Sequence, residues 1–208
     1  MTKCIGASII PFAICRRTHG IFFLLGKEKF CKKYPSDSEK WSDFGGRRKK
    51  TDSDPCDIAA REFYEETIGC VRFFAPDKVP RRGYKDISES LRNGEYVCKF
   101  SFSVGKNCQY VTFLKQIPLQ PEAPDIFKYS RRGLLRKEQG TASDFLEKTK
   151  ICWFGLPRIQ SAVHCTPVLK INTFEREYIR RWFRDRMRHI LDRFTFLPKP
   201  RPPPEEEE

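Results

Sequence analysis

The stretch from Trp41 to Val71 sets the strongest constraint on how this chain can fold. Within it, Glu62, Glu65 and Glu66 are spaced i, i+3 and i+4, so a helix places all three carboxylates on one narrow face. The opposite side of the same helix is small or apolar and suits burial; it carries Cys56, Ala59, Ala60, Phe63 and Thr67. Asp54 is a suitable N-cap, Pro55 fits the first turn, and Gly69 is a candidate stop.

The stacked glutamates favour a metal site. Like charges at this spacing repel by roughly a few tenths of a kcal/mol, and a helix does not need them in order to fold. Mg²⁺ takes oxygen ligands and is held by carboxylates together with waters and substrate phosphates. The alternative is a solvated acidic face over an ordinary core stripe. The Gly45-Gly46 pair and Arg61 favour the metal site, because that combination is rarer than a glutamate run alone.

These residues resemble the Nudix box, whose pattern is G, five residues, E, seven residues, R-E-U-x-E-E-x-G-U, with U a bulky apolar residue. The matching positions are Gly46, Arg61, Glu62, Phe63, Glu65 and Glu66. The sequence departs from the pattern in three places. Asp52 stands where the pattern has its first glutamate, one extra residue lies between Asp52 and Arg61, and Gly69 comes one residue late. These departures affect how the helix begins and ends rather than its carboxylates.

The resemblance implies an α/β/α sandwich around a mixed β-sheet. It also implies hydrolysis of a nucleoside diphosphate linked to another group, with Mg²⁺ or Mn²⁺ held by Glu62, Glu65 and Glu66 and with Glu66 or Glu65 as the strongest ligand. By the same resemblance, Arg61 orients the glutamates through ion pairs, and Asp52 supports them without being a metal ligand itself. Gly45 and Gly46 let the backbone turn tightly beside the metal.

A loop acid before the closing strand of Nudix proteins completes the metal shell or acts as the general base. Here the candidate closing strand is Ile151–Phe154, and Glu147 is the preferred loop acid for both roles. Three other acids compete for this position, because loop placement is poorly fixed by sequence; they are Glu122, Glu138 and Asp144.

The chain has 208 residues and a formal net charge of +13, which favours polyanionic partners and nucleic acid in particular. Gly46, Arg47, Arg48 and Lys49 are candidate phosphate contacts next to the carboxylate face, and the run continues to Lys50. A solvated basic loop is the alternative. The nine cysteines are odd in number and contain no C-x-x-C pair, so neither a disulfide framework nor a zinc ribbon is indicated. We expect a cytoplasmic protein in a reducing interior, with a nuclear location open, and no membrane partner.

The pattern predicts one domain over residues 1–197 and a disordered Pro/Glu tail over 198–208. Pro118–Tyr129 is expected to be irregular and Asp86–Arg92 a short helix. The remaining expected elements are strands at Cys4–Cys15, Ile21–Leu25, Trp41–Phe44, Val71–Phe74, Tyr96–Val104 and Gln109–Leu114.

A long basic amphipathic helix is predicted over Thr173–Phe194 as an addition at the C-terminal side. Its Arg180, Arg181 and Arg184 are candidate RNA contacts, because arginine pairs with phosphate and stacks on bases. The alternative is a docking helix whose arginines extend over the core. His189 is expected to lie at the surface.

The preferred hypothesis for the substrate is capped RNA, because the strong positive charge fits a long phosphate backbone. The chain is also loosely similar to decapping Nudix proteins of large DNA viruses. Two alternatives stay open: a hydrolase of small nucleotides (dinucleoside polyphosphate, ADP-ribose or nucleoside triphosphate), and a non-catalytic RNA-binding Nudix module. The oligomeric state does not follow from the sequence.

Overall fold

The structure is a computed structural model that describes residues 2–74, 82–136, 144–170 and 176–193. Its centre is a seven-stranded mixed sheet in the order β3-β2-β1-β6-β5, with β4 paired to β1 and β7 paired to β2. β1 and β6 are parallel, and the other pairs are antiparallel. The strands are β1 (Lys3–Ile14), β2 (Ile21–Glu28), β3 (Trp41–Ser42), β4 (Phe44–Arg47), β5 (Cys98–Ser103), β6 (Cys108–Gln116) and β7 (Lys148–Gly155).

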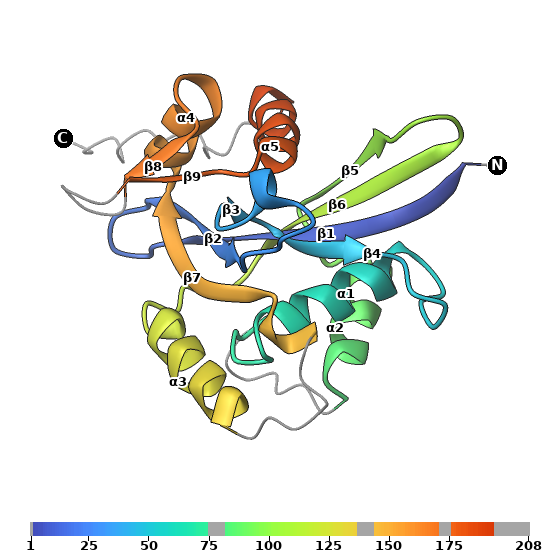
Figure 1. Cartoon of the computed structure of the whole chain (residues 1–208), viewed down its shortest axis with the longest axis horizontal. Helices are drawn as coiled ribbons and strands as arrows, with labels where there is room; N and C mark the ends of the chain where they lie inside the picture. The colour runs from blue at the N-terminus through green and yellow to red at the C-terminus, as the bar shows by residue number, and fades with distance from the viewer. Residues whose placement is uncertain (1, 75–81, 137–143, 171–175, 194–208) are drawn as a thin grey trace, which may run out of the picture.

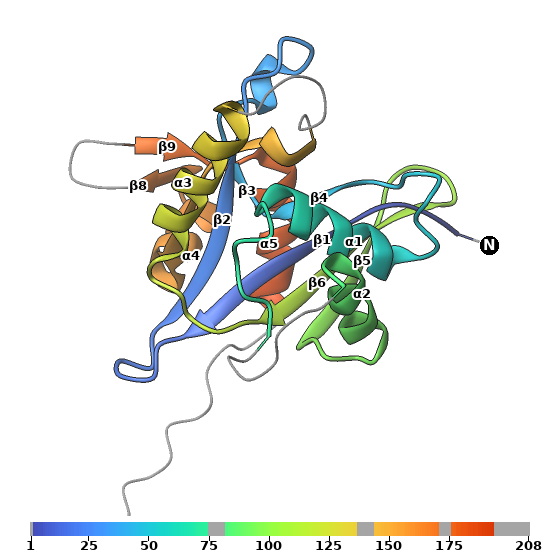
Figure 2. The same ribbon diagram turned by 90° about the horizontal axis from the view of Figure 1, so that it is seen from below.

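Helices cover both faces of this sheet (Figures 1 and 2). On one face lie α1 (Pro55–Glu66), α2 (Tyr84–Arg92) and α3 (Ala123–Arg136), and on the other lie α4 (Leu156–His164) and α5 (Arg181–Arg193). Two short 3-10 turns, η1 (Pro35–Asp37) and η2 (Asp144–Leu146), precede β3 and β7. The predicted α/β/α sandwich around a mixed sheet is therefore confirmed.

The sequence of β1 explains why it lies at the centre of the sheet. Its residues are almost all apolar, so both of its faces can be buried. Ala7 and Ile9 belong to the core on the α1 side, whereas Ile10 and Phe12 belong to the core on the α5 side. The alternation follows from the period of two in a strand.

The helix α1 begins and ends as its sequence predicts. The Asp54 carboxylate accepts a hydrogen bond from the Asp57 backbone N–H at 2.9 Å, and Pro55 is the first helical residue. The helix ends at Glu66, and Gly69 follows with a left-handed φ of 62°. The carboxylate face is thus built on a helix with a defined start and stop.

Two segments differ from the prediction on the α1 side. Val71–Phe74 is not a strand; Phe73 and Phe74 instead pack into the core, and the rings of Phe63 and Phe73 lie 5.5 Å apart. The run of apolar residues indicated burial correctly but not strand pairing. Pro118–Tyr129 is not irregular throughout, because α3 begins at Ala123 within it. Its three prolines led to that error, although Pro124 is tolerated in the first turn of a helix.

The long helix predicted over Thr173–Phe194 is also wrong in part. Residues 176–178 form the strand β9 (Arg176–Tyr178), which pairs with β8 (Val168–Lys170), and α5 begins only at Arg181. Glu177 and Ile179 are buried while Arg176 and Tyr178 are exposed, so the true period here is two. Residues 171–175, Phe194 and the predicted tail over 198–208 lie outside the described residues. Across the described ranges, no helix is long and apolar enough to cross a membrane.

The contact between α1 and α2 depends on one carboxylate. Asp57 Oδ1 accepts hydrogen bonds from Ser88 Oγ at 2.6 Å and from Arg92 Nη2 at 2.5 Å, and Asp57 Oδ2 accepts one from the Ser53 backbone N–H at 3.1 Å. Burial alone would raise the pKa of Asp57, but these hydrogen bonds, first those from Ser53 and Ser88, lower the pKa to about 2. The charged form of Asp57 therefore stabilises the fold.

We expect Asp57→Asn to remove part of the acid sensitivity of this protein. Because the folded pKa is lowered to about 2 from the ordinary value of 3.8, the stabilisation is present above about pH 4 and is lost as the pH falls through about 2. At neutral pH the variant should lose about 1–2 kcal/mol of the free energy of unfolding. Urea denaturation at several pH values measures both effects. A variant that loses stability with acid as steeply as the wild type would contradict this assignment.

Candidate metal centre and its ion pairs

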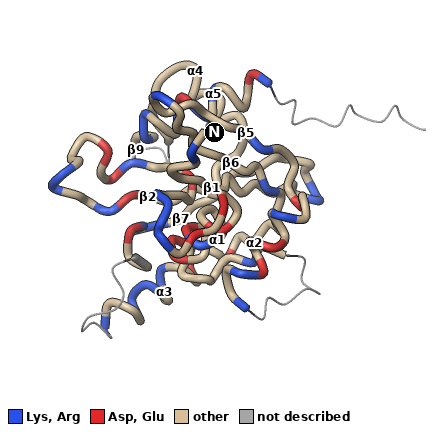
Figure 3. The backbone as a smooth tube through the Cα atoms, turned by 90° about the vertical axis from the view of Figure 1, so that its right-hand side faces the viewer, with Lys and Arg blue, Asp and Glu red and all other residues tan. Residues whose placement is uncertain are grey.

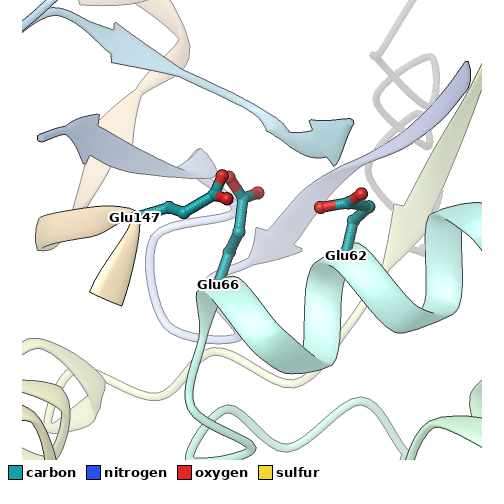
Figure 4. A group of neighbouring side chains, drawn as sticks. All are labelled: Glu62, Glu66 and Glu147. Atoms are coloured by element: carbon teal, nitrogen blue, oxygen red, sulfur yellow. The ribbon is translucent and has the colours of Figure 1, made fainter. Parts of the chain in front are cut away.

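Three carboxylates converge between α1 and the start of β7 (Figure 4). Glu62 and Glu66 come from α1, and Glu147 comes from the link between η2 and β7. One oxygen from each lies within 4.8 Å of the others. Glu62 and Glu66 are buried, whereas Glu147 is exposed. The structure thus brings the preferred loop acid Glu147 to the glutamates of the helix.

The competing loop acids do not join this cluster in the described structure. Glu122 is exposed and forms an ion pair with Arg72 at 3.4 Å. Glu138 and the side chain of Asp144 lie outside the described residues. The placement of Glu147 depends on the chain path through η2, which no sequence pattern specifies.

Glu65 is held apart from the other glutamates by two cations. Its Oε2 accepts hydrogen bonds from Arg61 Nη1 at 2.9 Å and from Lys49 Nζ at 3.2 Å. It is not in the group of three carboxylates whose oxygens converge. The sequence places all three helix glutamates on one face, but a helix face is broad enough for two different sets of partners. The ligand role of Glu65 stays a prediction.

Arg61 organises the base of the site through a buried network. Its Nε and Nη2 donate to both oxygens of Asp52 at 2.9 Å each, in bidentate geometry. Its Nη1 donates to Glu62 Oε1 and Glu65 Oε2, also at 2.9 Å. Asp52, which stands where the Nudix pattern has a longer glutamate, therefore anchors Arg61, and Arg61 in turn fixes the two glutamates. The predicted ion pairs of Arg61 are present.

The two glycines of β4 are required by close approach to the glutamates and to β1. The Gly45 backbone N–H donates to Glu66 Oε2 at 2.7 Å. A Cβ at Gly46 would lie 2.4 Å from Glu62 Oε1, and a Cβ at Gly45 would lie 2.2 Å from the Cβ of Ser8. Neither position can carry a side chain without displacing its neighbours.

Lys148, the first residue of β7, was not recognised from the sequence. Its side chain is fully buried, and Nζ donates to Glu28 Oε1 at 2.6 Å, Ser42 Oγ at 2.8 Å and the Asp43 carbonyl at 3.1 Å. It also lies 3.2 Å from Glu66 Oε1. Burial would lower the pKa of Lys148, but Glu28 and Glu66 outweigh burial and raise it. A lysine beside other polar residues ordinarily indicates a solvated position, so the sequence carries no signal for this contact.

The electrostatics of the cluster indicate excess negative charge. Burial raises the pKa of Glu62 to about 7, Glu147 and Glu65 add to the increase, and Arg61 opposes it. Burial also raises the pKa of Glu66 well above its ordinary value, against the lowering effect of Lys148. The donor set is all carboxylate oxygen, which suits a hard divalent cation such as Mg²⁺ or Mn²⁺. The residues present therefore fit the predicted metal.

The basic loop after β4 is partly occupied by internal contacts. Arg48 donates to the Asp52 carbonyl and the Ser53 carbonyl at 3.0–3.2 Å, and Lys49 pairs with Glu65. Arg47 and Lys50 are exposed beside the acidic cluster, and Gly46 lies against Glu62. Of the predicted phosphate contacts, Arg48 and Lys49 are therefore engaged by neighbouring residues, and Arg47 is an exposed side chain.

The arginines predicted to contact RNA also include residues with internal contacts and a residue that is exposed. Arg180 pairs with Glu28 at 3.4 Å and with Asp37 at 3.6 Å. Arg184 donates to the carbonyl groups of Val163 and Cys165 at the end of α4, at 2.9 and 3.3 Å. Arg181 is exposed. Arg180 and Arg184 thus support the docking alternative, and Arg181 remains open to solution.

A second buried arginine, Arg186 of α5, lies on the opposite side of the sheet. It donates to Ser8 Oγ at 2.8 Å, Thr112 Oγ1 at 2.6 Å and Asp43 Oδ1 at 2.8 Å. Asp43 thus joins the two sides, because its carbonyl accepts from Lys148 and its carboxylate accepts from Arg186. Among so many arginines on one helix, the sequence does not single out the buried one.

We expect Lys148→Met to lower the free energy of unfolding by about 3 kcal/mol or more, because it leaves Glu66 buried without its cation and removes the nearer of the two cations that pair with Glu28. Lys150→Met is the matched control on the same strand; that side chain is exposed, and its loss should cost no more than about 0.5 kcal/mol. Chemical denaturation of both variants gives the comparison. Equal losses would show that Lys148 contributes no more than a surface lysine.

Mg²⁺ or Mn²⁺ should raise the melting temperature of the protein, because cation binding relieves the repulsion within the cluster. At about 100 times the dissociation constant, the stabilisation corresponds to about 2.7 kcal/mol. Glu62→Gln and Glu147→Gln should reduce this increment, whereas Glu122→Gln, at the exposed ion pair with Arg72, should retain it. An increment that is the same in all three variants would place the bound ion elsewhere.

No protein-family model and no curated protein matches the sequence. Among solved structures, the chain is similar to an Ap4A hydrolase from C. elegans in a binary complex (13% identity over 91% of this chain and 99% of that chain, TM-score 0.41). It is also similar to the NUDIX domain of Shewanella oneidensis NrtR bound to ADP ribose (10% identity, 92% and 90% covered, TM-score 0.41). A third is a NUDIX hydrolase from Nitrosomonas europaea (12% identity, 92% and 73% covered, TM-score 0.43).

Similarity at this level does not transfer a substrate or an activity from one protein to another. The fold assignment follows from the chain itself: a Gly-Gly strand end leads into a capped helix, whose glutamates face a loop acid between two layers of helices around a mixed sheet. The chain therefore has the α/β/α sandwich around a mixed sheet that its resemblance to the Nudix box predicts.

Proposed function

We propose that this protein is a metal-dependent pyrophosphohydrolase that cleaves a nucleoside diphosphate linked to another group, with capped RNA as its substrate. The observation that carries the proposal is the convergence of Glu62, Glu66 and Glu147 to within 4.8 Å beside a positively charged loop. Bringing three carboxylates together costs free energy unless a cation compensates their charge. A cation bound there could also contact a substrate phosphate.

Hydrolysis of a pyrophosphate requires its negative charges to be offset before water can attack a phosphorus. A divalent cation supplies that neutralisation and acidifies a nearby water. In the proposed site, Glu62, Glu66 and Glu147 hold the cation, and Glu147, the exposed member, is the candidate general base. Arg61 keeps Glu62 and Glu65 in place through its ion pairs. Arg47 and Lys50 extend toward solvent, where the outer phosphates of a substrate would lie.

The preference for an RNA substrate rests on charge. The net charge of +13 exceeds what a small nucleotide needs for binding. Lys and Arg lie along several separate stretches of the backbone, including α3, and Asp and Glu form a group close to α1 besides others elsewhere (Figure 3). A positive surface around a small acidic centre suits a ligand whose pyrophosphate continues into a phosphodiester chain.

Two other functions remain as alternatives. A hydrolase of small nucleotides would use the same cluster, and its positive charge would serve other purposes. A non-catalytic RNA-binding module would use the basic surface alone, but it has no need of three converging carboxylates. Solved structures similar to this chain include an Ap4A hydrolase and an ADP-ribose complex, so both nucleotides belong in any test panel.

Product analysis with the purified protein and Mg²⁺ or Mn²⁺ tests the proposal. The panel contains cap-labelled RNA, free cap dinucleotide, ADP-ribose, a diadenosine polyphosphate and nucleoside triphosphates. We expect release of a cap nucleoside diphosphate from RNA, with a loss of at least 100-fold in Glu66→Gln, since that change removes a candidate ligand charge. Glu89→Gln, an exposed glutamate on α2, is the control.

The other outcomes decide among the alternatives. Cleavage of a small nucleotide alone would retain the metal site and reject RNA as the substrate. Activity on capped RNA should fall steeply as salt rises, because phosphate contacts release counterions. No metal-dependent product from any substrate, together with RNA binding, would favour the binding module.

A further inference from the structure

A groove lies beside β7, on the side away from the acidic cluster's helix α1. β7 pairs with β2, and among the described strands none pairs with its other edge, where α3 packs instead (Figure 1). The groove has a volume of about 440 Å³, which is within the range of pockets that hold a small organic ligand. Its floor is apolar and is formed by Trp41, Phe127 and Ile151.

The rim of the groove is positively charged. Lys128, Arg131 and Arg132 of α3 stand on one side, and Lys150 of β7 stands on the other. Asp125 and Glu177 also line the groove, but Glu177 already forms an ion pair with Lys27, with 2.6 Å between Glu177 Oε1 and Lys27 Nζ. The remaining balance is positive, so the charge of the groove is complementary to an anion.

The groove and the acidic cluster are linked through the first residue of β7. Arg131 Nε, on the rim of the groove, donates to the Lys148 carbonyl at 2.9 Å, and Lys148 directly follows Glu147. The Lys148 ammonium in turn lies 3.2 Å from Glu66. One residue of β7 thus contacts both the rim of the groove and a candidate metal ligand.

We propose that this groove binds the ribose-phosphate chain of a single-stranded RNA whose 5′ pyrophosphate lies at the acidic cluster. The inference rests on the proposed function and names where the body of its substrate lies. An apolar floor under a cationic rim suits the sugar and base of a nucleotide together with its phosphate. An acidic peptide is the rival occupant, since an unpaired strand edge can also accept a peptide strand. The link through Lys148 to the proposed pyrophosphate site, together with the cationic rim, favours RNA.

Charge reversal at the two exposed helix positions tests the groove directly. The double variant Lys128→Glu with Arg132→Glu changes the rim and leaves Arg131, which contacts the β7 backbone, in place. Lys99→Glu with Lys106→Glu is the matched control, because it makes the same change in net charge at exposed positions on β5 and the β5–β6 turn. Thermal denaturation confirms that both proteins are folded.

The first readout is binding of a fluorescent, uncapped 12-nucleotide RNA to the full chain, measured by anisotropy at several salt concentrations. We expect the groove variant to bind at least tenfold more weakly, and the slope of log K against log salt to fall by about 0.7 for each lost phosphate contact. The control should weaken less than twofold. Equal weakening in both variants would overturn the inference, as would a wild type that does not bind this RNA.

The second readout separates this inference from the proposed function. If capped RNA is cleaved, the KM of the groove variant for capped RNA should rise at least tenfold relative to its KM for cap dinucleotide. If the protein cleaves capped RNA but the groove variant changes neither this ratio nor RNA binding, the groove is rejected as the RNA site and the enzymatic activity is retained. If the protein cleaves no cap but the groove variant loses RNA binding, the groove is retained as an RNA site and decapping is rejected. If a Pro- and Glu-rich peptide binds with the same dependence on Lys128 and Arg132 and RNA does not, the groove is a peptide site.

Discussion

The buried ammonium group of Lys148 is the interaction on which the candidate site depends. It lies between Glu28 and Glu66, at 2.6 and 3.2 Å; without it, the buried Glu66 carboxylate would lose its cation, and Glu28 would keep only its longer ion pair with Arg180. Each buried ion costs several kcal/mol in the absence of a partner. Because Lys148 meets part of that cost permanently, Glu66 can stay in place before any metal arrives.

Two buried arginines compensate carboxylates in the same manner, one on each side of the short segment from Trp41 to Arg47. Arg61 fixes Glu62 and Glu65 on the α1 side, and Arg186 holds the Asp43 carboxylate on the α5 side. All three cations are almost fully buried; Lys148 and Arg186 each contact an acid from a distant part of the chain, whereas the acids that Arg61 contacts lie within nine residues of it. The segment between them is thus held from both faces of the sheet, which keeps the Gly45 N–H directed at Glu66.

Local patterns predicted the parts of the fold that depend on neighbouring residues. The cap at Asp54, the carboxylate face of α1, the β5–β6 hairpin and the need for Gly46 all follow from spacing along the chain. Patterns that report burial alone did not specify structure: Val71–Phe74 is apolar but unpaired, and the helical spacing before Arg181 hid the strand β9.

The candidate site, like the fold, was predictable only where it depends on residues close together in the sequence. Its helix glutamates have a signature, whereas Glu147 could only be chosen among rivals and Lys148 could not be chosen at all. Both lie on a stretch whose position is set by pairing β7 with β2, more than 100 residues apart in sequence. The same holds for Arg180 and Arg184, whose partners Glu28 and Val163 are known only once the tertiary contacts are.

The strand β9 has a consequence for the order in which the protein folds. Glu177 accepts hydrogen bonds from the side chains of Trp41 and Lys27, and the Arg180 backbone N–H donates to the Trp41 carbonyl at 2.9 Å. The short strand β3, which precedes the glycine strand β4, is therefore held by residues that lie far from it in the sequence. The helix α1 can form from its own cap and local spacing, but β3 can be held in place only after β9 has packed against it. The segment beside the acidic cluster is thus completed by long-range contacts, after the helix that carries Glu62 and Glu66 has formed.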